Sequence, residues 1–355
     1  MNLQTIIEFI VALTSLMILH ELGHFLAFRL LKVEVEELGL GIPPRAITLF
    51  EARGTKYTLN WIPFGAFVRP KGENDPSIPG GLAAAKPWAR ITIFLAGPIM
   101  NLLAAVLLYI VAYSGVGYLP DRNRVALLAI SEGSPAEQAG LQIEDIVVRV
   151  GDEEINSFDE LKGIIYANLG IPLQFFYERD GELLETTVTP LENPGEQGAV
   201  GIYMGYPFKP FTLLAAIPEG FASTYEYCRA LYDMLAGLIQ GRVSSEEGRL
   251  VGFKGMYDLY TSVRENEPVN GVPAQVNIAV FFASITISLG LLNLLPIPAL
   301  DGGRIVLTLP ELILRRRLKP EYEAWMVGVS LILLLVLILV INVQDFINPV
   351  PTPIP

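Results

Sequence analysis

Four stretches of this chain are long enough and apolar enough to cross a lipid bilayer as helices. A hydrocarbon core about 30 Å thick needs roughly 20 mostly apolar residues in helical form. These stretches are residues 3–31, 91–119, 276–300 and 325–341, and the last three contain no charged residue. Charged residues make up only 17% of the chain, whereas a soluble protein has about 25%. The sequence therefore predicts a polytopic α-helical membrane protein with four transmembrane helices.

The distribution of Lys and Arg predicts how these helices are oriented. Residues 29–90 contain nine of them and residues 301–323 contain five, whereas 121–274 contains eleven against 24 Asp and Glu. Lys and Arg in short loops favour the cytoplasmic side, and long translocated segments are largely exempt from this rule. We therefore expect 29–90 and 301–323 in the cytoplasm, and both termini and 121–274 outside. The net charge of −12 gives no electrostatic reason to expect nucleic-acid binding.

The loop after the first span predicts a membrane-associated β-hairpin region on the cytoplasmic side. Residues 33–40 and 57–68 are apolar and β-branched, and the turn-rich stretches 41–44 and 53–55 separate them. Their apolarity suggests that the hairpins return toward the membrane, which is allowed only where protein or water satisfies the backbone. An ordinary cytoplasmic hairpin domain explains the pattern equally well.

A compact α+β domain is predicted at residues 121–192. Its expected order is a strand at 125–130, a capped helix from Ser134, a strand at 146–150, a helix from Ser157, and a hairpin at 173–188. This order, together with the segment Ser-Pro-Ala-x-x-Ala-Gly-Leu that begins at Ser134, resembles a bacterial-type PDZ domain. PDZ domains bind peptides by adding a strand to an exposed sheet edge, so peptide termini are an expected ligand here.

These observations give nine expected segments. They are a first transmembrane helix (1–31), the β-hairpin region (32–87), a second helix (88–120), the extracytoplasmic PDZ-like domain (121–192), an amphipathic outer-surface segment (193–274), a third helix (275–303), a basic cytoplasmic loop (304–323), a fourth helix (324–343) and a Pro-rich tail (344–355).

The motif His20-Glu21-Leu22-Gly23-His24 lies within the first apolar stretch. On a helix, His20 and His24 are one turn apart and share a face, so both imidazoles can bind one Zn²⁺ ion. Glu21 beside them is placed to take a proton from a water molecule that the metal activates. Charged groups inside a bilayer cost at least ~2.5 kcal/mol each and are functional by default. A polar patch that packs helices is the alternative interpretation.

A catalytic zinc site uses three protein ligands and keeps one position open. The chain has only two histidines, so the third ligand must be a carboxylate or Cys228. Asp301 is the best candidate, because it lies at the cytoplasmic end of the third span, at the depth expected for His20 and His24. The Pro and Gly residues of segment 293–303 should break the helix and free this carboxylate. Capping of a helix end is the alternative role for Asp301.

Three motifs together resemble the site-2 protease family of intramembrane zinc metalloproteases: the histidine motif, Gly97-Pro98-x-x-Asn101, and Asn293-x-x-Pro-x-Pro-x-Leu-Asp301-Gly-Gly. With one PDZ-like domain between the second and third spans, the chain is similar to the regulator-of-sigma-E protease branch, whose better-known members carry two. The resemblance implies regulated intramembrane proteolysis in a bacterial inner membrane. It also implies that His20, His24 and Asp301 bind zinc and that Glu21 is the catalytic base.

The resemblance further implies how the substrate binds. A membrane-associated β-element should present a single-span membrane protein as an added strand, which makes Gly65 and Phe67 expected substrate-binding residues. Asn101 and Asn293 match motif asparagines and should contact the substrate backbone, with interhelical hydrogen bonding as the alternative. The implied substrates are anti-sigma factors or remnant signal peptides, first shortened outside by another protease and tested by the PDZ-like domain.

Two functions of other classes also fit the sequence. The chain could be a metal-ion transporter that uses the same ligands, or a non-catalytic PDZ scaffold with membrane anchors. Glu21 favours the protease, because a transporter needs metal ligands but no general base.

Overall fold

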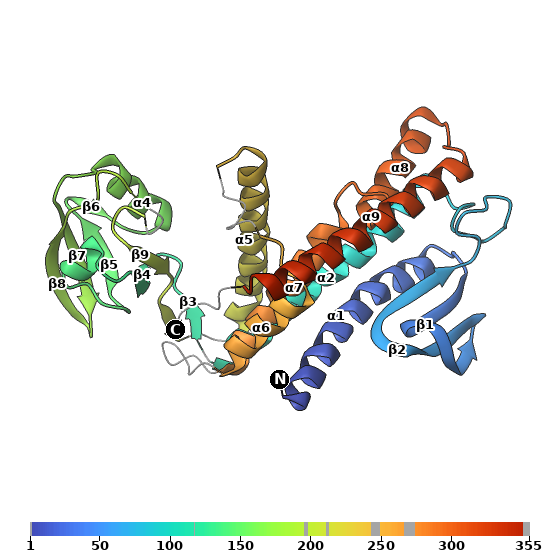
Figure 1. Ribbon diagram of the computed structural model, residues 1–355, viewed down its shortest axis with the longest axis horizontal. Helices are drawn as coiled ribbons and strands as arrows, with labels where there is room; N and C mark the ends of the chain where they lie inside the picture. The colour runs from blue at the N-terminus through green and yellow to red at the C-terminus, as the bar shows by residue number, and fades with distance from the viewer. Residues whose placement is uncertain are drawn as a thin grey trace. The chain divides into compact units, whose positions relative to one another are not determined.

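The computed structural model describes residues 2–116, 118–194, 198–210, 213–242, 249–265 and 274–350. The chain forms two compact units, which are considered separately here (Figure 1). The first unit consists of residues 1–116 and 216–355, and the second of residues 117–215.

The described part of the first unit contains helices and one long β-hairpin. Its helices are α1 (Leu3–Leu30), α2 (Pro87–Val116), α5 (Leu213–Ile239, which begins at the unit boundary), α6 (Phe253–Glu265), α7 (Ala274–Asn293), α8 (Asp301–Leu314) and α9 (Pro320–Ile347). Four of these helices, α1, α2, α7 and α9, are long and apolar enough to cross a membrane. The prediction of four spanning helices is therefore confirmed at the level of length and composition.

The bounds predicted for the third and fourth spans differ from those of α7 and α9. Helix α7 ends at Asn293 rather than near residue 300, because Pro296 and Pro298 lack an N–H and disfavour a helix before them. Helix α9 has 28 residues rather than 17. Pro320 occupies its first turn, where proline is favoured, and acidic residues there suit the helix dipole. The polar ends therefore continue the helix beyond its apolar centre.

Segment 304–323 was predicted to be a basic loop, and the structure corrects this. Residues 301–314 form α8, with Asp301 in the first turn. Apolar residues fill most of 305–314. They favour a helix, but the prediction considered only the charged residues of this segment. The basic residues 315–319 make the short connection to α9.

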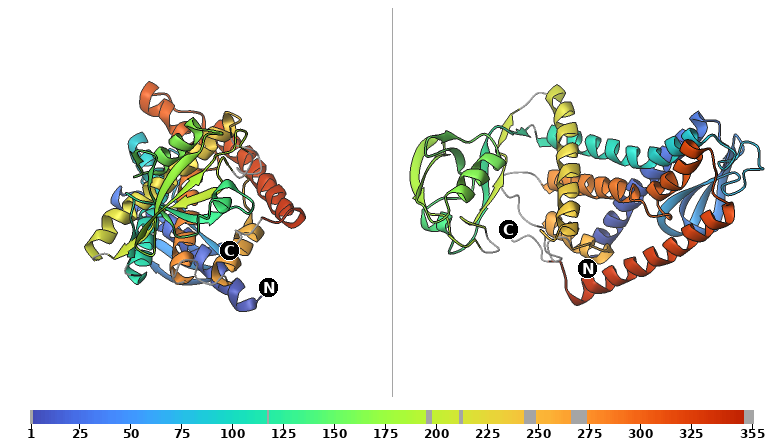
Figure 2. Two further views of the ribbon diagram at one scale, coloured as in Figure 1. Left: turned by 90° about the vertical axis from the view of Figure 1, so that its left-hand side faces the viewer. Right: turned by 90° about the horizontal axis from the view of Figure 1, so that it is seen from above.

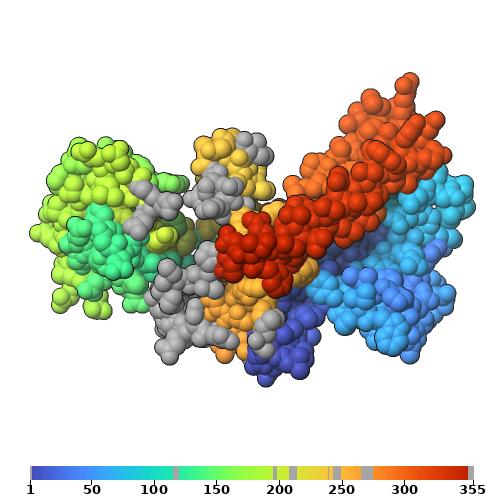
Figure 3. Space-filling model, viewed as in Figure 1, coloured from blue at the N-terminus to red at the C-terminus, as the bar shows by residue number. Residues whose placement is uncertain are grey.

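Helix α2 lies between α1 and α7, and the three run along one another in Figures 1 and 2. Glycines allow the close approach on both sides. A Cβ at Gly23 of α1 would lie 2.4 Å from the carbonyl oxygen of Ala96, and one at Gly290 of α7 would lie 3.2 Å from that of Pro98. Small residues at such contacts are typical of helices packed within membranes. Helix α9 instead lies on the surface of this unit, largely exposed (Figure 3).

The hairpin of β1 (Val35–Ala52) and β2 (Thr55–Pro70) folds back on itself. Residues 37–40 pair with 66–69 on one side and with 56–59 on the other, and 45–52 pair with 55–60. The result is a small antiparallel sheet in which 66–70 forms one edge. The turn at Arg53-Gly54 was predicted correctly, whereas the expected turn at 41–44 is a bend within β1.

The second unit is built on a sheet with the strand order β8-β7-β5-β4-β9. Its elements are β3 (Tyr118–Pro120), β4 (Val125–Ile130), α3 (Pro135–Gln138), β5 (Ile146–Val150), β6 (Glu153–Glu154), α4 (Phe158–Ala167), β7 (Leu173–Arg179), β8 (Glu182–Val188), β9 (Ile202–Gly205) and β10 (Phe208–Pro210). The strands and helices predicted between 125 and 188 are present. The predicted domain end at residue 192 was wrong, because β9, at residues 202–205, pairs with β4 and forms one edge of the sheet.

The rest of the expected outer-surface segment, 193–274, contains α5 and α6. Helix α6 packs on two spanning helices, since Phe9 of α1 stacks on Tyr260 with ring centroids 5.4 Å apart, and Tyr260 also contacts Phe282 of α7. Residues 195–197, 211–212, 243–248 and 266–273 of this segment, and 351–355 of the expected tail, lie outside the described residues.

Candidate active site

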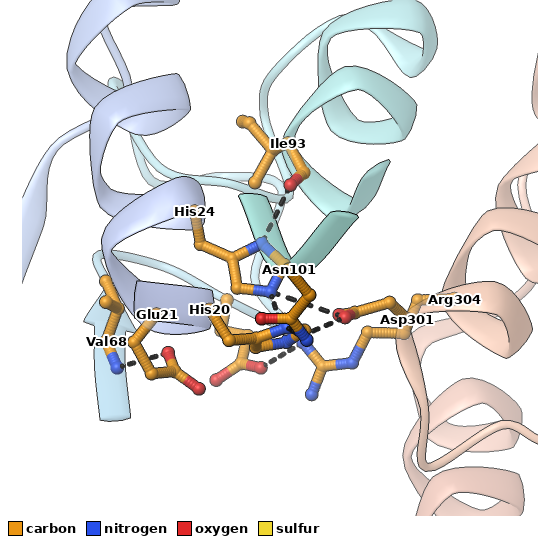
Figure 4. A network of polar contacts seen from close by, with 9 residues as sticks. His20, Glu21, His24, Val68, Ile93, Asn101, Asp301 and Arg304 are labelled. Carbon is orange, nitrogen blue, oxygen red and sulfur yellow. Dashed lines mark hydrogen bonds and ion pairs between the residues drawn. The ribbon is translucent and has the colours of Figure 1, made fainter. Parts of the chain in front are cut away.

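The two histidines of α1 face α2 and α8 in the interior of the first unit (Figure 4). Both are 8% exposed. Their Nε2 atoms lie 3.2 Å apart, and the carboxylate oxygen Oδ2 of Asp301 lies 3.2 Å from His20 Nε2 and 3.3 Å from His24 Nε2. Among the described residues, these three side chains form the one group of His, Cys, Asp and Glu that could hold a metal ion.

The protonation of His24 can be deduced from its other ring nitrogen. Its Nδ1 lies 2.8 Å from the carbonyl oxygen of Ile93, which can only accept a hydrogen bond, so Nδ1 carries the proton. In the neutral ring, Nε2 then directs a lone pair toward His20 and Asp301. Electron-rich atoms this close repel one another unless a cation lies between them.

The spacing of the three atoms fits zinc. Tetrahedral zinc binds nitrogen and oxygen ligands at about 2.0–2.1 Å, which separates neighbouring ligands by about 3.3–3.4 Å. The observed separations of 3.2, 3.2 and 3.3 Å are close to this value. The donor set of two imidazoles and one carboxylate, with a position left for a fourth ligand, is that of a catalytic zinc site.

Asp301 is held in place by the two glycines that follow it. A Cβ at Gly302 would lie 2.1 Å from the carbonyl oxygen of Leu294, and a Cβ at Gly303 would lie 2.0 Å from that of Ile297. Only glycine lets α8 begin so close to the chain that leaves α7. The N-cap of α8 is Leu300, which makes no side-chain capping bond, and the carboxylate of Asp301 is directed at the histidines instead.

Glu21 points away from the histidines toward the β-sheet (Figure 4). Its Oε2 accepts a hydrogen bond of 3.0 Å from the backbone N–H of Val68. Val68 belongs to the edge segment 66–70, and its N–H is used by Glu21 of α1. Glu21 and Val68 line the same cavity as the three ligand side chains, so a carboxylate base, a metal site and a sheet edge share one space.

The predicted substrate-binding residues fall into two groups. Phe67 and Asn293 line the cavity. Gly65 has a φ of +82° and packs against Met17 of α1, and it is not among the lining residues. Asn101 is 0% exposed, lies beside His20 and is not among the lining residues, so its contact with the substrate backbone stays a prediction that the cavity does not support.

Sequence reasoning gave no role to two residues at or near the site. The first is Gly97 of the second motif, where a Cβ would lie 2.3 Å from His24 Nε2 and 2.8 Å from His20 Cε1. The second is Arg304, one helical turn after Asp301, which forms an ion pair of 2.6 Å with Glu73 at the cavity wall. The i, i+3 spacing of Arg304 from the third ligand was the available signal for it.

Comparison with known proteins agrees with the geometry. The model of peptidase family M50 matches residues 8–337. A Clostridium perfringens protein, whose name places it among the zinc metalloproteases, is 29% identical over 97% of this chain and 99% of its own length. Metalloprotease MmpA of Caulobacter vibrioides is 27% identical over 92% of each chain. The regulator of sigma-W protease RasP of Bacillus subtilis is 26% identical over 97% of this chain and 99% of its own.

The matched range, residues 8–337, includes every residue that lines the cavity. These similarities select the protease over the metal-ion transporter and the non-catalytic scaffold, which the sequence alone left open. The chain therefore belongs to peptidase family M50, the site-2 proteases, and is an intramembrane zinc metalloprotease.

Proposed function

We propose that this protease cleaves membrane-spanning segments of single-span membrane proteins after they join the edge of its β-sheet as an added strand. The observation that carries the proposal is the bond between Glu21 and Val68, which joins the carboxylate of Glu21 to the sheet edge. A transmembrane helix hides its peptide bonds, because every amide is already hydrogen-bonded within the helix. Pairing with residues 66–70 would stabilise the unwound, cleavable form.

In this proposal His20, His24 and Asp301 hold the metal and Glu21 is the catalytic base. Zinc, when bound, supplies a Lewis acid that polarises the scissile carbonyl and makes water more acidic. Glu21 takes the proton from that water and later delivers it to the amine that leaves. Phe67 and Asn293, which line the cavity, would contact the substrate on either side of the scissile bond.

We further propose the topology that the charge distribution favours. Residues 29–90 and 301–323 would face the cytoplasm, and both termini and residues 121–274 would lie outside the inner membrane of a bacterium. The ligands lie near the ends of α1 and α7 that adjoin the basic segments, so water would reach the zinc from the cytoplasm. Cleavage would then release a fragment inward.

The second unit would be an extracytoplasmic PDZ-like domain with revised bounds of 117–215. Strand β9 is the terminal strand of its sheet and offers an edge to which a peptide terminus could add. This domain would test whether the outer part of a substrate has been shortened. The name of the Bacillus subtilis relative refers to regulation of a sigma factor, which supports anti-sigma factors as one substrate class beside remnant signal peptides.

The test is cleavage of a single-span substrate by the full chain in liposomes. We expect the wild-type protein to cleave within the spanning segment, and both Glu21→Gln and a zinc chelator to abolish cleavage. In a control substrate, leucines that stabilise the helix replace the residues of the spanning segment and the rest of the sequence is kept. This substrate should be cleaved more slowly. Cleavage confined to loops outside the bilayer would refute the proposal.

A further inference from the structure

Three residues of α2 contact the zinc-site histidines, and they are spaced four apart. Ile93, Gly97 and Asn101 therefore form one stripe along the face of α2 that α1 covers. The carbonyl of Ile93 accepts from His24 Nδ1 at 2.8 Å. Gly97 leaves room for both rings to pack against the helix backbone, since any Cβ there would overlap them.

Asn101, the third member of the stripe, contacts His20. It is 0% exposed, and its amide group lies 3.1 Å from His20 Nδ1 with the nitrogen, Nδ2, nearest. Its Oδ1 is a buried oxygen that has no hydrogen-bond partner among the described residues. The nitrogen and oxygen of an asparagine amide exchange places by a half-turn of the side chain. After that turn, Oδ1 would accept a hydrogen bond from Nδ1–H of His20.

We propose that Asn101 is a positioning residue whose Oδ1 accepts the Nδ1 proton of His20 and thereby keeps Nε2 free to bind the metal. This inference rests on the zinc site proposed above. Asn101 would then serve His20 as the carbonyl of Ile93 serves His24: each is an uncharged acceptor for the Nδ1 proton of its histidine. Partners of this kind fix the tautomer and orientation of metal-binding histidines.

An amide suits this position better than a carboxylate. A charged acceptor buried among spanning helices is costly, whereas the asparagine side chain adds no charge. Space is also limited, because a Cβ on Gly290 of α7 would lie 3.1 Å from the Cβ of Asn101. Helix α7 therefore packs directly against α2 at this residue.

Thr286 of α7 provides a matched control. Its hydroxyl donates to the backbone carbonyl of Asn101 at 3.4 Å, and it is itself 0% exposed. This bond joins α2 to α7 without touching a histidine. If Asn101 only packed helices together, Thr286→Ala and Asn101→Ala would have similar consequences.

The experiment measures the zinc dissociation constant of the full chain in detergent by competition with a chromophoric chelator. We expect Asn101→Ala to weaken zinc binding by about 10–100-fold and Thr286→Ala to leave it unchanged. Asn101→Asp keeps an oxygen that can accept the Nδ1 proton of His20, so it should bind zinc more tightly than Asn101→Ala does. Wild-type affinity in Asn101→Ala would overturn the inference, and so would an Asn101→Asp variant as weak as Asn101→Ala.

Kinetics separate this role from substrate binding. If Asn101 acts only through His20, Asn101→Ala at saturating zinc should lower kcat and leave KM unchanged, whereas loss of a substrate contact would raise KM. A higher KM with unchanged zinc affinity would contradict the inference. The proposed substrate class fails by a different result, namely a wild-type protein that binds zinc tightly but does not cleave a spanning segment.

Discussion

The carboxylate of Glu21 accepts a hydrogen bond from the backbone N–H of Val68, 47 residues later in the chain. The N–H of an edge strand is the group that an added strand would use for pairing. Arrival of a substrate strand would therefore compete for Val68 and release Glu21 toward the scissile bond. In the proposed function, substrate pairing and base catalysis would meet at this one hydrogen bond.

Glu21→Gln should separate binding from chemistry. The amide keeps the shape of the side chain but cannot take a proton, so we expect cleavage to fall by about 10²–10⁴-fold. Zinc content should stay at the wild-type level, because Glu21 is not among the three clustered ligand side chains. Metal analysis and the liposome assay on one preparation check both statements, and a fully active variant would exclude Glu21 as the base.

Asp301→Ala should remove the metal. Two histidines alone would hold zinc weakly, and we expect the affinity to fall by on the order of 100-fold or more, since loss of an outer partner alone costs 10–100-fold. The zinc content after dialysis is the measurement. A suitable control is Glu311→Ala, also on α8, whose carboxylate pairs with Arg90 at 2.8 Å rather than with the histidines. Undiminished zinc in Asp301→Ala would remove this residue from the site.

Gly97→Ala should damage the site by a single methyl group. The added Cβ would lie 2.3 Å from His24 Nε2, so the ring must move away from Asp301 and zinc affinity should drop. Gly328→Ala in α9 is the matched control, because no atom of the residues that the structure describes would lie within 4 Å of the added Cβ. There the change should be neutral or stabilise the helix by up to about 1 kcal/mol. Equal zinc binding by the two variants would contradict the packing described for α2.

Local signals made part of this site predictable from the sequence. The spacing of His20 and His24 needs only helix geometry, and Asp301 was suggested by the prolines and glycines around it. The motif that contains Asn101 suggested a contact with the substrate, but a motif does not show which way a helix is turned. Its contact with His20 depends on how α2 packs against α1, and the bond between Glu21 and Val68 depends on the folding of a whole β-sheet. Neither contact can be predicted from a local sequence pattern.

The fold shows the same division between local and long-range information. Spanning helices were found from apolar runs, but the ends of α9 were missed because polar and charged residues interrupt the apolar run there. The strand β9 was missed because it is only four residues long and comes after a stretch rich in glycine. Its identity as a strand is fixed by pairing with β4, which lies more than 70 residues earlier.

Glu37 should make the β-sheet sensitive to acid. It is 3% exposed and lies between Arg45 and Arg69, with a hydrogen bond from Thr58. Burial by itself would raise the pKa of Glu37, but hydrogen bonds from Arg45 and Thr58 and the two positive charges outweigh it and lower the pKa below 4.5. A lowered pKa means that the stabilisation is present above about pH 4.5 and is lost as the pH falls through the folded value.

The variant Glu37→Gln tests this directly. Near neutral pH it should destabilise the sheet by about 1–3 kcal/mol, measured as faster proteolysis within residues 41–54. The difference from wild type should shrink as the pH falls below about 4.5. A difference that persists unchanged in acid would show that the carboxylate charge is not what stabilises the sheet.

Asp345 should hold α9 to the rest of the first unit. Its side chain is 0% exposed and accepts hydrogen bonds from the backbone N–H groups of Gly252 and Gly255, at the start of α6, and from Arg249. Most of the apolar centre of α9 is exposed, so the hydrogen bonds of Asp345 make up much of the contact between the C-terminal end of α9 and the rest of the unit. Removing it leaves buried donors unpaired, and we expect Asp345→Ala to cost about 2–4 kcal/mol.

A cysteine pair that joins the end of α9 to α6 can measure this attachment. Asn342→Cys with Gly252→Cys brings two thiols together, because a Cβ at Gly252 would lie 3.0 Å from Cγ of Asn342, and the cross-link should form in an otherwise wild-type chain. In the Asp345→Ala background it should form more slowly, because the end of α9 would spend part of its time detached. Ser330→Ala serves as the control, since its hydroxyl bonds only to Val327 of the same helix. Equal cross-linking rates in all three backgrounds would mean that the apolar contacts of α9 suffice without Asp345.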